Sequence, residues 1–362
     1  MDIDVLLRTA AQHRASDVHL QTDSPPTLRV NGRLMPINAP PATADDIHAA
    51  FRQIATERMQ RIVEERRSGD FAYLLPDVAR FRVNVFYERG RLCLAFRLIP
   101  LAPPGFAELH LPPVVEEIAQ AGRGLVLVTG TTSSGKSTTL AAIVDHLNTT
   151  RRLRIVTIED PIEFVHTSKK SLVAQREVGA DTPGFLEALR RALRQDPDVI
   201  LVGELRDLAT VKTALRAGDT GHIVYSTVHT TNAAQTVQRL IALFPPNERE
   251  LLLTQLSTNL KAVMSQRLAR TRDGNALVPV VEVLRSTPVV RKMILENRTG
   301  ALPQAMANQE QGMQLFDQHL ATLFRAEVIS DTEALRLATN QEALALALRG
   351  ITSGDTSPGL VR

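Results

Sequence analysis

Residues 124–140 hold the side chains best suited to chemistry, in the sequence GLVLVTGTTSSGKSTTL. An apolar run is followed by Gly-x-x-x-x-Gly-Lys-Ser and then by a run typical of a helix, which is the strand–loop–helix context that a phosphate-binding loop requires. Backbone N–H groups of the loop and of the helix N-terminus would bind phosphate oxygens. Lys136 would reach the β- and γ-phosphates, and the Ser137 hydroxyl would ligate Mg²⁺. The sequence therefore predicts a site for ATP and Mg²⁺.

The loop residues expected at the nucleotide are consecutive: Gly130, Thr131, Thr132, Ser133, Ser134, Gly135, Lys136, Ser137 and Thr138. Ser133 stands where many such loops carry another glycine. If this position requires a positive φ, Ser133 adds strain on the order of 1 kcal/mol. The alternative is a chance glycine-rich turn, against which the Lys-Ser pair and the preceding strand argue.

Three further apolar runs end in a polar side chain. Runs 155–158, 199–202 and 223–228 lead into Glu159, Glu204 and His229. Because the site of an open parallel sheet lies at the carboxyl ends of its strands, we expect these side chains around the same phosphates. An apolar run that ends in an acid is the Walker B signature, which places Glu204 in the Mg²⁺ shell through water. His229 is the better candidate of two histidines for a γ-phosphate sensor.

The segment TIEDPIEF at 157–164 supplies further acids. Glu163 is a candidate to polarise the attacking water, and Glu159 and Asp160 would shape the metal environment. Taken alone, each acid could equally cap a helix or form a salt bridge. His222 has the opposite strand parity to His229, and it is either a second nucleotide-binding histidine or an ordinary hydrogen-bonded one.

Composition limits the classes of protein to consider. The chain has 362 residues, enough for two domains, and a formal charge of +3 with Lys and Arg scattered along it. The absence of Trp and of basic runs argues against a nucleic-acid partner. Its one cysteine, Cys93, excludes an internal disulfide. With no apolar run of about 18 residues and no targeting segment, we expect a cytoplasmic protein without direct membrane insertion.

The first hundred residues read as an α+β domain. Helices are expected at 2–14 and from Thr43 to Val63, a hairpin around Asn31-Gly32, and strands at 16–20, 71–75, 80–87 and 92–99. Alternating apolar residues in the last two strands put Arg82 and Arg97 together on the face away from the core. From composition alone, a solvated sheet face is the favoured interpretation of these arginines.

A Pro-rich linker is expected at 101–115, and strands and helices alternate beyond it, which favours a parallel α/β sheet over 116–349. The expected strands are 124–129, 155–158, 199–202, 222–228 and 279–284. The expected helices are 137–148, 183–194, 207–217, 233–243, 248–268, 288–297, 313–325 and 331–348. Residues 350–362 are expected to form a disordered tail.

With these motifs identified, the chain resembles the type IV pilus retraction ATPases, the PilT/PilU family of the secretion ATPase superfamily. The matching segments are ASDVHL at 15–20, RFRVN at 80–84, the loop at 130–137, TIEDPIEF at 157–164, QREVG at 175–179, LRQDPDVILVGELRD at 193–207, TGH at 220–222, STVHTTNAAQTVQRLI at 226–241 and GMQLFDQ at 312–318. The resemblance implies a Walker A motif at Gly130–Ser137, an Asp box at Ile158–Glu163 with Glu163 as catalytic glutamate, a Walker B motif ending at Glu204, and a His box at Gly221–His229.

The resemblance also implies a PAS-like N-terminal domain at 1–100, a RecA-like P-loop ATPase domain at 116–349, and a homohexamer with ATP between subunits. It reverses the interpretation of Arg82 and Arg97, which match positions that the family aims at the nucleotide phosphates; Arg194 and Arg239 are further candidates. The implied partner is a pilus platform protein of the inner membrane, where the motor would be peripheral, and a paralogous retraction ATPase is a second possible partner.

Two departures keep alternatives open. The stretch VVRKMILE at 289–296 keeps only part of the family's retraction motif and resembles the accessory PilU type, whereas the P-loop and HTTNAA segment resemble PilT. A chain with Cys93 alone cannot form the tetracysteine zinc site of the extension ATPases. We therefore expect an ATP-hydrolysing hexameric motor for pilus retraction and twitching motility, with an accessory PilU-type ATPase as the alternative. A RecA-like nucleic-acid motor and a nucleotide-binding regulator without hydrolysis are further alternatives.

Overall fold

The computed structural model describes residues 2–13, 15–30, 32–99 and 102–349. Asn31 of the expected hairpin turn, Leu101 of the expected linker and the expected tail at 350–362 lie outside the described residues. The chain divides into two compact units, one of residues 1–103 with Glu163–Val165 and one of residues 104–162 with the chain from His166 onward.

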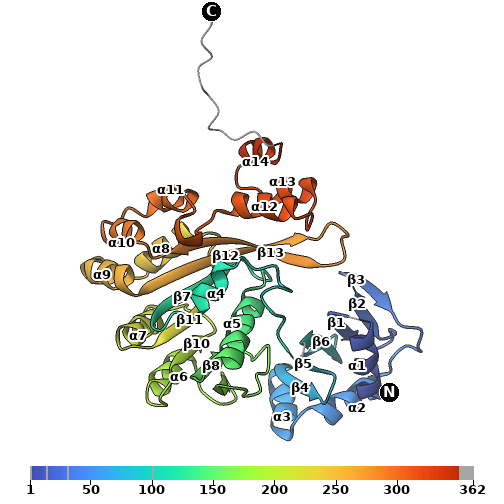
Figure 1. Ribbon diagram of the computed structural model, residues 1–362. Helices are drawn as coiled ribbons and strands as arrows, with labels where there is room; N and C mark the ends of the chain where they lie inside the picture. Colours follow the sequence, from blue (N-terminus) through green and yellow to red (C-terminus); the bar gives the residue numbers. More distant parts are fainter. Residues whose placement is uncertain (1, 14, 31, 100–101, 350–362) are drawn as a thin grey trace, which may run out of the picture. The chain divides into compact units, whose positions relative to one another are not determined.

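Over its described residues, the first unit is a six-stranded antiparallel sheet with three helices (Figure 1). The strand order is β3-β2-β1-β6-β5-β4. The strands are β1 (Asp17–Leu20), β2 (Thr27–Val30), β3 (Arg33–Pro36), β4 (Ser68–Leu75), β5 (Ala79–Glu88) and β6 (Arg91–Ile99), and the helices are α1 (Ile3–Gln12), α2 (Ala44–Ile54) and α3 (Glu57–Arg66). Phe81, Val83 and Phe96 are buried in its core, as the alternating pattern predicts.

The register of β5 and β6 confirms the expected placement of two arginines. Arg82 pairs with Arg97 directly across the two strands, so both side chains lie on one face of the sheet. Their neighbours Phe81 and Val83 are fully buried on the other face. The hairpin therefore presents two positive charges side by side.

The single helix expected from Thr43 to Val63 is wrong, because the chain forms two helices here. Thr43 and Asp46 form a capping box at the start of α2, and Ala55 ends that helix in an extended conformation. The Thr56 side chain then accepts a hydrogen bond from Met59 N and begins α3. Local capping by Thr56 thus interrupts an apolar pattern that continues through both helices.

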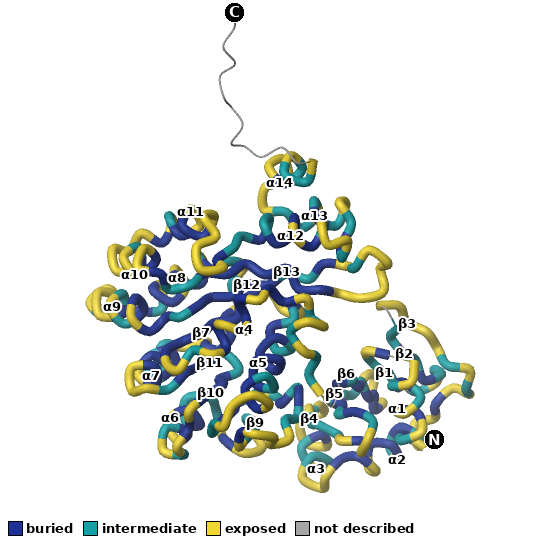
Figure 2. Tube along the Cα trace, viewed as in Figure 1, coloured by how far each residue is buried: buried dark blue, intermediate teal, exposed yellow. Residues whose placement is uncertain are grey.

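The second unit is built on a seven-stranded sheet, which confirms the expected α/β fold with a parallel sheet. The strand order is β13-β12-β7-β11-β10-β8-β9, and every pair is parallel except β12 with β13. The strands are β7 (Gly124–Gly130), β8 (Arg154–Glu159), β9 (Leu172–Glu177), β10 (Val199–Val202), β11 (Ile223–Val228), β12 (Leu260–Arg270) and β13 (Leu277–Arg285). Every residue of β7 is buried, as expected for a central strand covered on both faces (Figure 2).

Helices cover both faces of this sheet (Figure 1). Val126 and Val128 face α4 (Val114–Ala119) and α5 (Lys136–Thr150). Leu125 and Leu127 face the opposite layer, which consists of α6 (Phe185–Ala192), α7 (Leu208–Asp219), α8 (Ala233–Ala242), α9 (Arg249–Asn259), α10 (Pro288–Leu295) and α11 (Leu302–Ala307). A smaller cluster joins the ends of β12 and β13 to α12 (Phe316–Arg325), α13 (Asp331–Leu337) and α14 (Gln341–Leu348).

The expected helix at 248–268 is wrong beyond Asn259. The chain turns extended at Leu260 and continues as β12, which lies between β7 and β13. Ala262 and Met264 pack on the α5 side of the sheet and Val263 on the other, so the strand is apolar on both faces. The expected helix at 331–348 is likewise two helices, since α13 ends at Leu337 and Asn340 caps α14.

Among the described residues, no helix combines the length and the apolar character needed to cross a bilayer.

A buried histidine fastens α12 to the sheet. His319 is 4% exposed, and its Nδ1 accepts a hydrogen bond from the backbone N of Val281 on β13 at 2.9 Å. Burial lowers the pKa of His319 from 6.5 to about 4, because a charged imidazolium would lose its hydration there. His319 is therefore neutral in the folded protein at physiological pH.

This burial predicts a loss of stability in mild acid. The pKa of His319 is lower in the folded than in the unfolded chain, so the unfolded chain binds more protons and stability falls as the pH drops from 6.5 toward 4. At pH 4.5 this amounts to roughly 2–3 kcal/mol in the free energy of unfolding. His319→Asn keeps an acceptor for Val281 N and removes the titration, so urea unfolding should show a smaller loss between pH 7 and 4.5 than in the wild type. The exposed His13→Asn is the control, and an equal pH dependence in all three proteins would contradict the prediction.

Candidate functional site

The loop between β7 and α5 has the backbone that a phosphate-binding loop needs. Gly130 has φ +142° and Gly135 has φ +86°. A Cβ at Gly130 would lie 2.4 Å from Ser134 Oγ and 2.5 Å from the carbonyl O of Gln266, so no other residue fits there. Ser133 has φ +62°, which confirms the positive φ considered from the sequence. Such a backbone costs a non-glycine residue on the order of 1 kcal/mol.

Two polar side chains of this loop, Ser134 and Lys136, are buried. Lys136 is 8% exposed, and its Nζ donates to the carbonyls of Gly130 at 3.0 Å and Thr131 at 2.8 Å. The Ser134 hydroxyl is buried, and within the described chain it has no hydrogen-bond partner. Helix α5 begins at Lys136, so the N–H groups of its first turn lack partners within the helix. A cradle of N–H groups, a buried ammonium and an orphaned hydroxyl fits a nucleotide phosphate with its metal ion.

Three other polar groups follow the carboxyl ends of the next three strands in the sheet. Strands β7, β11, β10 and β8 are neighbours in that order, and their carboxyl ends lead into the P-loop, His229, Glu204 and Glu159. The Glu204 side chain is 16% exposed, and its carboxylate lies 2.7 Å from Arg206 Nε and 3.4 Å from His229 Nε2. The structure therefore brings Glu204 and His229 together at the carboxyl ends of the strands, where the P-loop also lies.

One acid of the Asp box, Glu159, is held by the edge strand β9. Glu159 Oε1 accepts hydrogen bonds from Thr157 Oγ1 at 2.6 Å and from Gln175 Nε2 at 3.1 Å. The exposed Asp160 follows, with a cis peptide bond to Pro161. Glu163 belongs by its surroundings to the first unit rather than to the unit that holds the P-loop.

Arg82 and Arg97, the opposed arginines of β5 and β6, have exposed side chains and are each paired with an acid. Arg97 Nε lies 3.0 Å from Asp17 Oδ1, and Arg82 Nε lies 3.7 Å from Asp70 Oδ1. Their side chains are 67% and 43% exposed. Like charges directly opposite each other in a sheet are unfavourable, so this face suits an anionic ligand.

His222 is not brought to the P-loop. It precedes β11, at the amino end of the strand, whereas His229 follows the carboxyl end. Its Nδ1 lies 3.1 Å from both the Ala217 carbonyl and Thr220 Oγ1. Within this unit, the arrangement matches the ordinary hydrogen-bonded histidine that the sequence left as one alternative.

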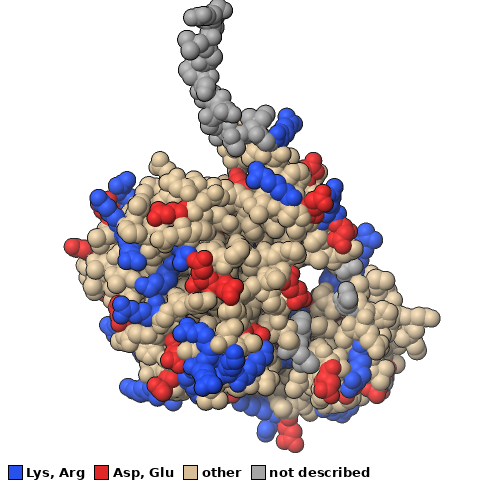
Figure 3. Space-filling model, in the orientation of Figure 1, with Lys and Arg blue, Asp and Glu red and all other residues tan. Residues whose placement is uncertain are grey.

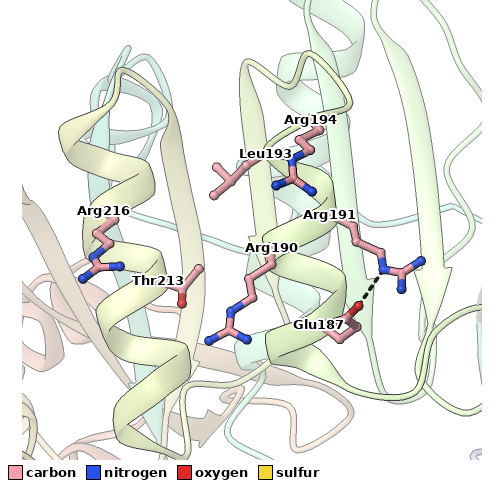
Figure 4. Close-up of a pocket in the computed structure, with 7 residues that line it drawn as sticks. All are labelled: Glu187, Arg190, Arg191, Leu193, Arg194, Thr213 and Arg216. Atoms are coloured by element: carbon pink, nitrogen blue, oxygen red, sulfur yellow. Dashed lines mark hydrogen bonds and ion pairs between the residues drawn. The ribbon is translucent and has the colours of Figure 1, made fainter.

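Arg194 lies in a groove between α6 and α7 (Figure 4). Arg190, Arg191 and Arg216 line the same groove, and Arg191 is paired with Glu187 at 2.7 Å. Arg194 follows the carboxyl end of α6 and precedes the amino end of β10. It therefore lies at the amino ends of the strands, whereas the P-loop lies at their carboxyl ends. Arg239 is exposed on α8.

Sequence reasoning missed the side chains that β12 contributes behind the loop. Gln266 is 1% exposed, and its Nε2 donates to Thr139 Oγ1 of α5 at 2.7 Å. Ser265 accepts a hydrogen bond from Thr129 Oγ1 of β7 at 2.9 Å. The signal for them is a Ser-Gln pair inside an apolar run, and the expectation of a helix at 248–268 hides it.

Comparison with known proteins identifies the family. The family model described as Type II/IV secretion system protein matches residues 1–278. The type IV pilus retraction ATPase PilT of Pseudomonas aeruginosa is 45% identical over 92% of this chain and 97% of its own length, and the type IV pilus ATPase PilU of the same organism is 37% identical over 96% and 92%. A crystal structure of the pilus retraction motor PilT with bound ADP has a TM-score of 0.86 at 40% identity, covering 94% of this chain and 98% of that one. The chain therefore belongs to the PilT/PilU family of type II/IV secretion system proteins.

Proposed function

We propose that this chain is an ATP hydrolase, a mechanical motor that powers type IV pilus retraction and hence twitching motility. The observation that carries the proposal is the P-loop beside His229 and Glu204 on neighbouring strand ends, in a chain similar to a retraction ATPase over nearly its full length. Phosphoryl transfer requires charge neutralisation, metal placement and an oriented water, and this edge of the sheet offers side chains for each.

The roles follow from the geometry and chemistry of the side chains. Lys136 holds the β- and γ-phosphates, and Ser137 and Glu204 hold Mg²⁺, which neutralises phosphate charge when bound. His229 senses the γ-phosphate from its place beside Glu204. Glu163 polarises the attacking water.

The remaining polar residues support these roles. Glu159 and Asp160 shape the metal environment at the end of β8. Arg82 and Arg97 supply positive charge to the phosphates from their exposed face of the first unit. His222, at the far end of β11, is the least supported of the predicted nucleotide ligands.

The proposed working assembly is a homohexamer with ATP between subunits. In it the first unit acts as a PAS-like domain and the second as a RecA-like domain, and hydrolysis drives the closure and opening of one domain relative to the other. The motor works in the cytoplasm at the inner membrane and acts on the platform protein of the pilus, with a paralogous retraction ATPase as a second partner.

Two alternatives are weaker. Identity is higher to PilT than to PilU, at 45% against 37%, which favours the principal motor over the accessory type. The divergent stretch at 289–296 lies mostly on α10, where Val289 and Leu295 are exposed, and it is the feature that supports the accessory type. For a nucleic-acid motor, the face visible in Figure 3 carries one dense group of basic side chains, while elsewhere basic and acidic side chains are mixed and form no continuous basic stripe.

Removing the P-loop ammonium or the Walker B acid should abolish turnover. Lys136→Ala and Glu204→Ala should each reduce the rate of phosphate release at least about 10²-fold, because each removes charge stabilisation of the transferred phosphate. Both variants should keep the oligomer mass of the wild type in light scattering. Lys170→Ala, at an exposed lysine, should be unchanged. Full activity in either site variant would refute the assignment.

Arg97 should act in hydrolysis rather than in folding. Arg97→Ala should lower kcat by about 10³-fold, the lower range for arginines that contact a transferred phosphoryl group. Arg91→Ala is the matched control, because Arg91 is exposed on the same strand and paired with Asp23. A kcat for Arg97→Ala equal to that of Arg91→Ala would return Arg97 to a solvated sheet face.

Deletion of the gene should leave cells with surplus, non-retracting pili and without twitching. The wild-type chain should restore retraction, and Lys136→Ala should not, because force requires hydrolysis. Electron microscopy and surface-motility assays measure both outcomes. Bald cells would instead indicate an assembly motor.

A further inference from the structure

Several hydroxyl groups lie between the His229 loop and the strand that precedes the P-loop. Thr236 of α8 and Thr129 of β7 are both fully buried. Thr236 Oγ1 lies 2.7 Å from Thr230 Oγ1, one residue beyond His229, and 3.4 Å from Thr129 Oγ1. Thr129 in turn donates to Ser265 Oγ at 2.9 Å. Thr236 therefore lies between two parts of the candidate site that are far apart in the sequence.

The contacts of Thr236 define its donor and acceptor roles. Its Oγ1 also lies 2.8 Å from the carbonyl O of Asn232. Because a hydroxyl has one proton, both short contacts are satisfied when Thr230 donates to Thr236 and Thr236 donates to Asn232. Thr236 thus holds the loop at one side chain and at one backbone carbonyl. A valine of the same shape would lose both of these side-chain hydrogen bonds and keep only the backbone bond from Thr236 N to the Asn232 carbonyl at 3.0 Å.

The loop 229–233 is held more tightly than the histidine that it carries. Glu282 accepts a hydrogen bond from Ala233 N at 2.7 Å, and Asn232 Oδ1 accepts one from Gln235 N at 2.8 Å. The His229 side chain is 46% exposed, and its ring lies 3.4 Å from Glu204, a longer contact than those that anchor the loop. The loop therefore determines where the imidazole lies.

We propose that Thr236 is a positioning residue for hydrolysis, whose hydroxyl fixes the loop 229–233 so that His229 stays beside Glu204. The inference rests on the proposed function, in which His229 senses the γ-phosphate. A displacement of about 1 Å in a catalytic group can lower a rate about 10²-fold, so the loss of two anchoring hydrogen bonds is expected to appear in kcat.

Steady-state ATP hydrolysis by the full chain tests this role. Thr236→Val should lower kcat about 10- to 100-fold and leave KM within about twofold, since the P-loop contacts are retained. Thr236→Ser, which keeps the hydroxyl, should stay within about threefold of the wild type. The control is Thr254→Val: exposed Thr254 on α9 makes the same kind of bond, to the carbonyl of Glu250 at 3.1 Å, and its removal should change nothing.

A double-mutant cycle separates positioning from a general packing defect. In a His229→Ala background, measured by single turnover, Thr236→Val should lower the rate by less than about twofold, because the group that it positions is gone. Thr230→Val removes the same contact from the loop side and should give the same result if Thr236→Val does not fold. Two results would overturn the inference: a Thr236→Val variant with the kcat of the wild type, or a fall in the single-turnover rate that is as large in the His229→Ala background as in the wild type. An inactive wild type would overturn the proposed function, and this inference with it.

Discussion

The close approach of β12 to the P-loop is the constraint on which the second unit depends. The carbonyl of Gln266 lies so near Gly130 that a single added carbon would be 2.5 Å away. A loop this close to β12 requires β7 to lie directly beside that strand. It does so from the middle of the sheet, where β7 is parallel to β11 on one side and to β12 on the other. The apolar residues of β7 satisfy that requirement, because they fill both layers of the sheet. The position of the phosphate cradle is therefore set by the core and not by the loop alone.

The sequence predicted the chemistry of the strand ends better than the framework around them. The P-loop and the adjacency of Glu204 and His229 follow from apolar runs that each end in a polar residue, and parallel strands bring such ends to one edge. Strand β12 was not predicted, because Leu260 continues directly from α9 without Gly or Pro to mark the change. Strand β9 was missed because it is a half-buried edge strand whose Gln175 and Glu177 hold the Asp box instead of a core.

The first unit shows where local patterns were sufficient and where they were not. Alternation fixed the faces of β5 and β6, since one buried face leaves a single register. It could not tell whether Arg82 and Arg97 are functional, because an exposed arginine suits water as well as phosphate. The register adds one observation about the charge on this face. Two opposed arginines repel each other, and their pairs with Asp17 and Asp70 still leave the side chains of Arg97 and Arg82 67% and 43% exposed.

The hydroxyl groups behind the P-loop pose a different question: why these buried positions are polar, when aliphatic side chains could also stabilise the core there. Thr236 occupies the buried face of α8 beside Val237 and Leu240, where an aliphatic residue would pack well. When both partners of a buried hydrogen bond are replaced by apolar groups of the same shape, stability often changes little. The orientation of the loop is a separate matter from stability. Dispersion contacts have no preferred direction, whereas a hydrogen bond does, so only the hydrogen bond fixes how the two groups are oriented. Buried hydroxyl groups can therefore hold the loop that carries the His229 imidazole in one orientation, which aliphatic side chains cannot do.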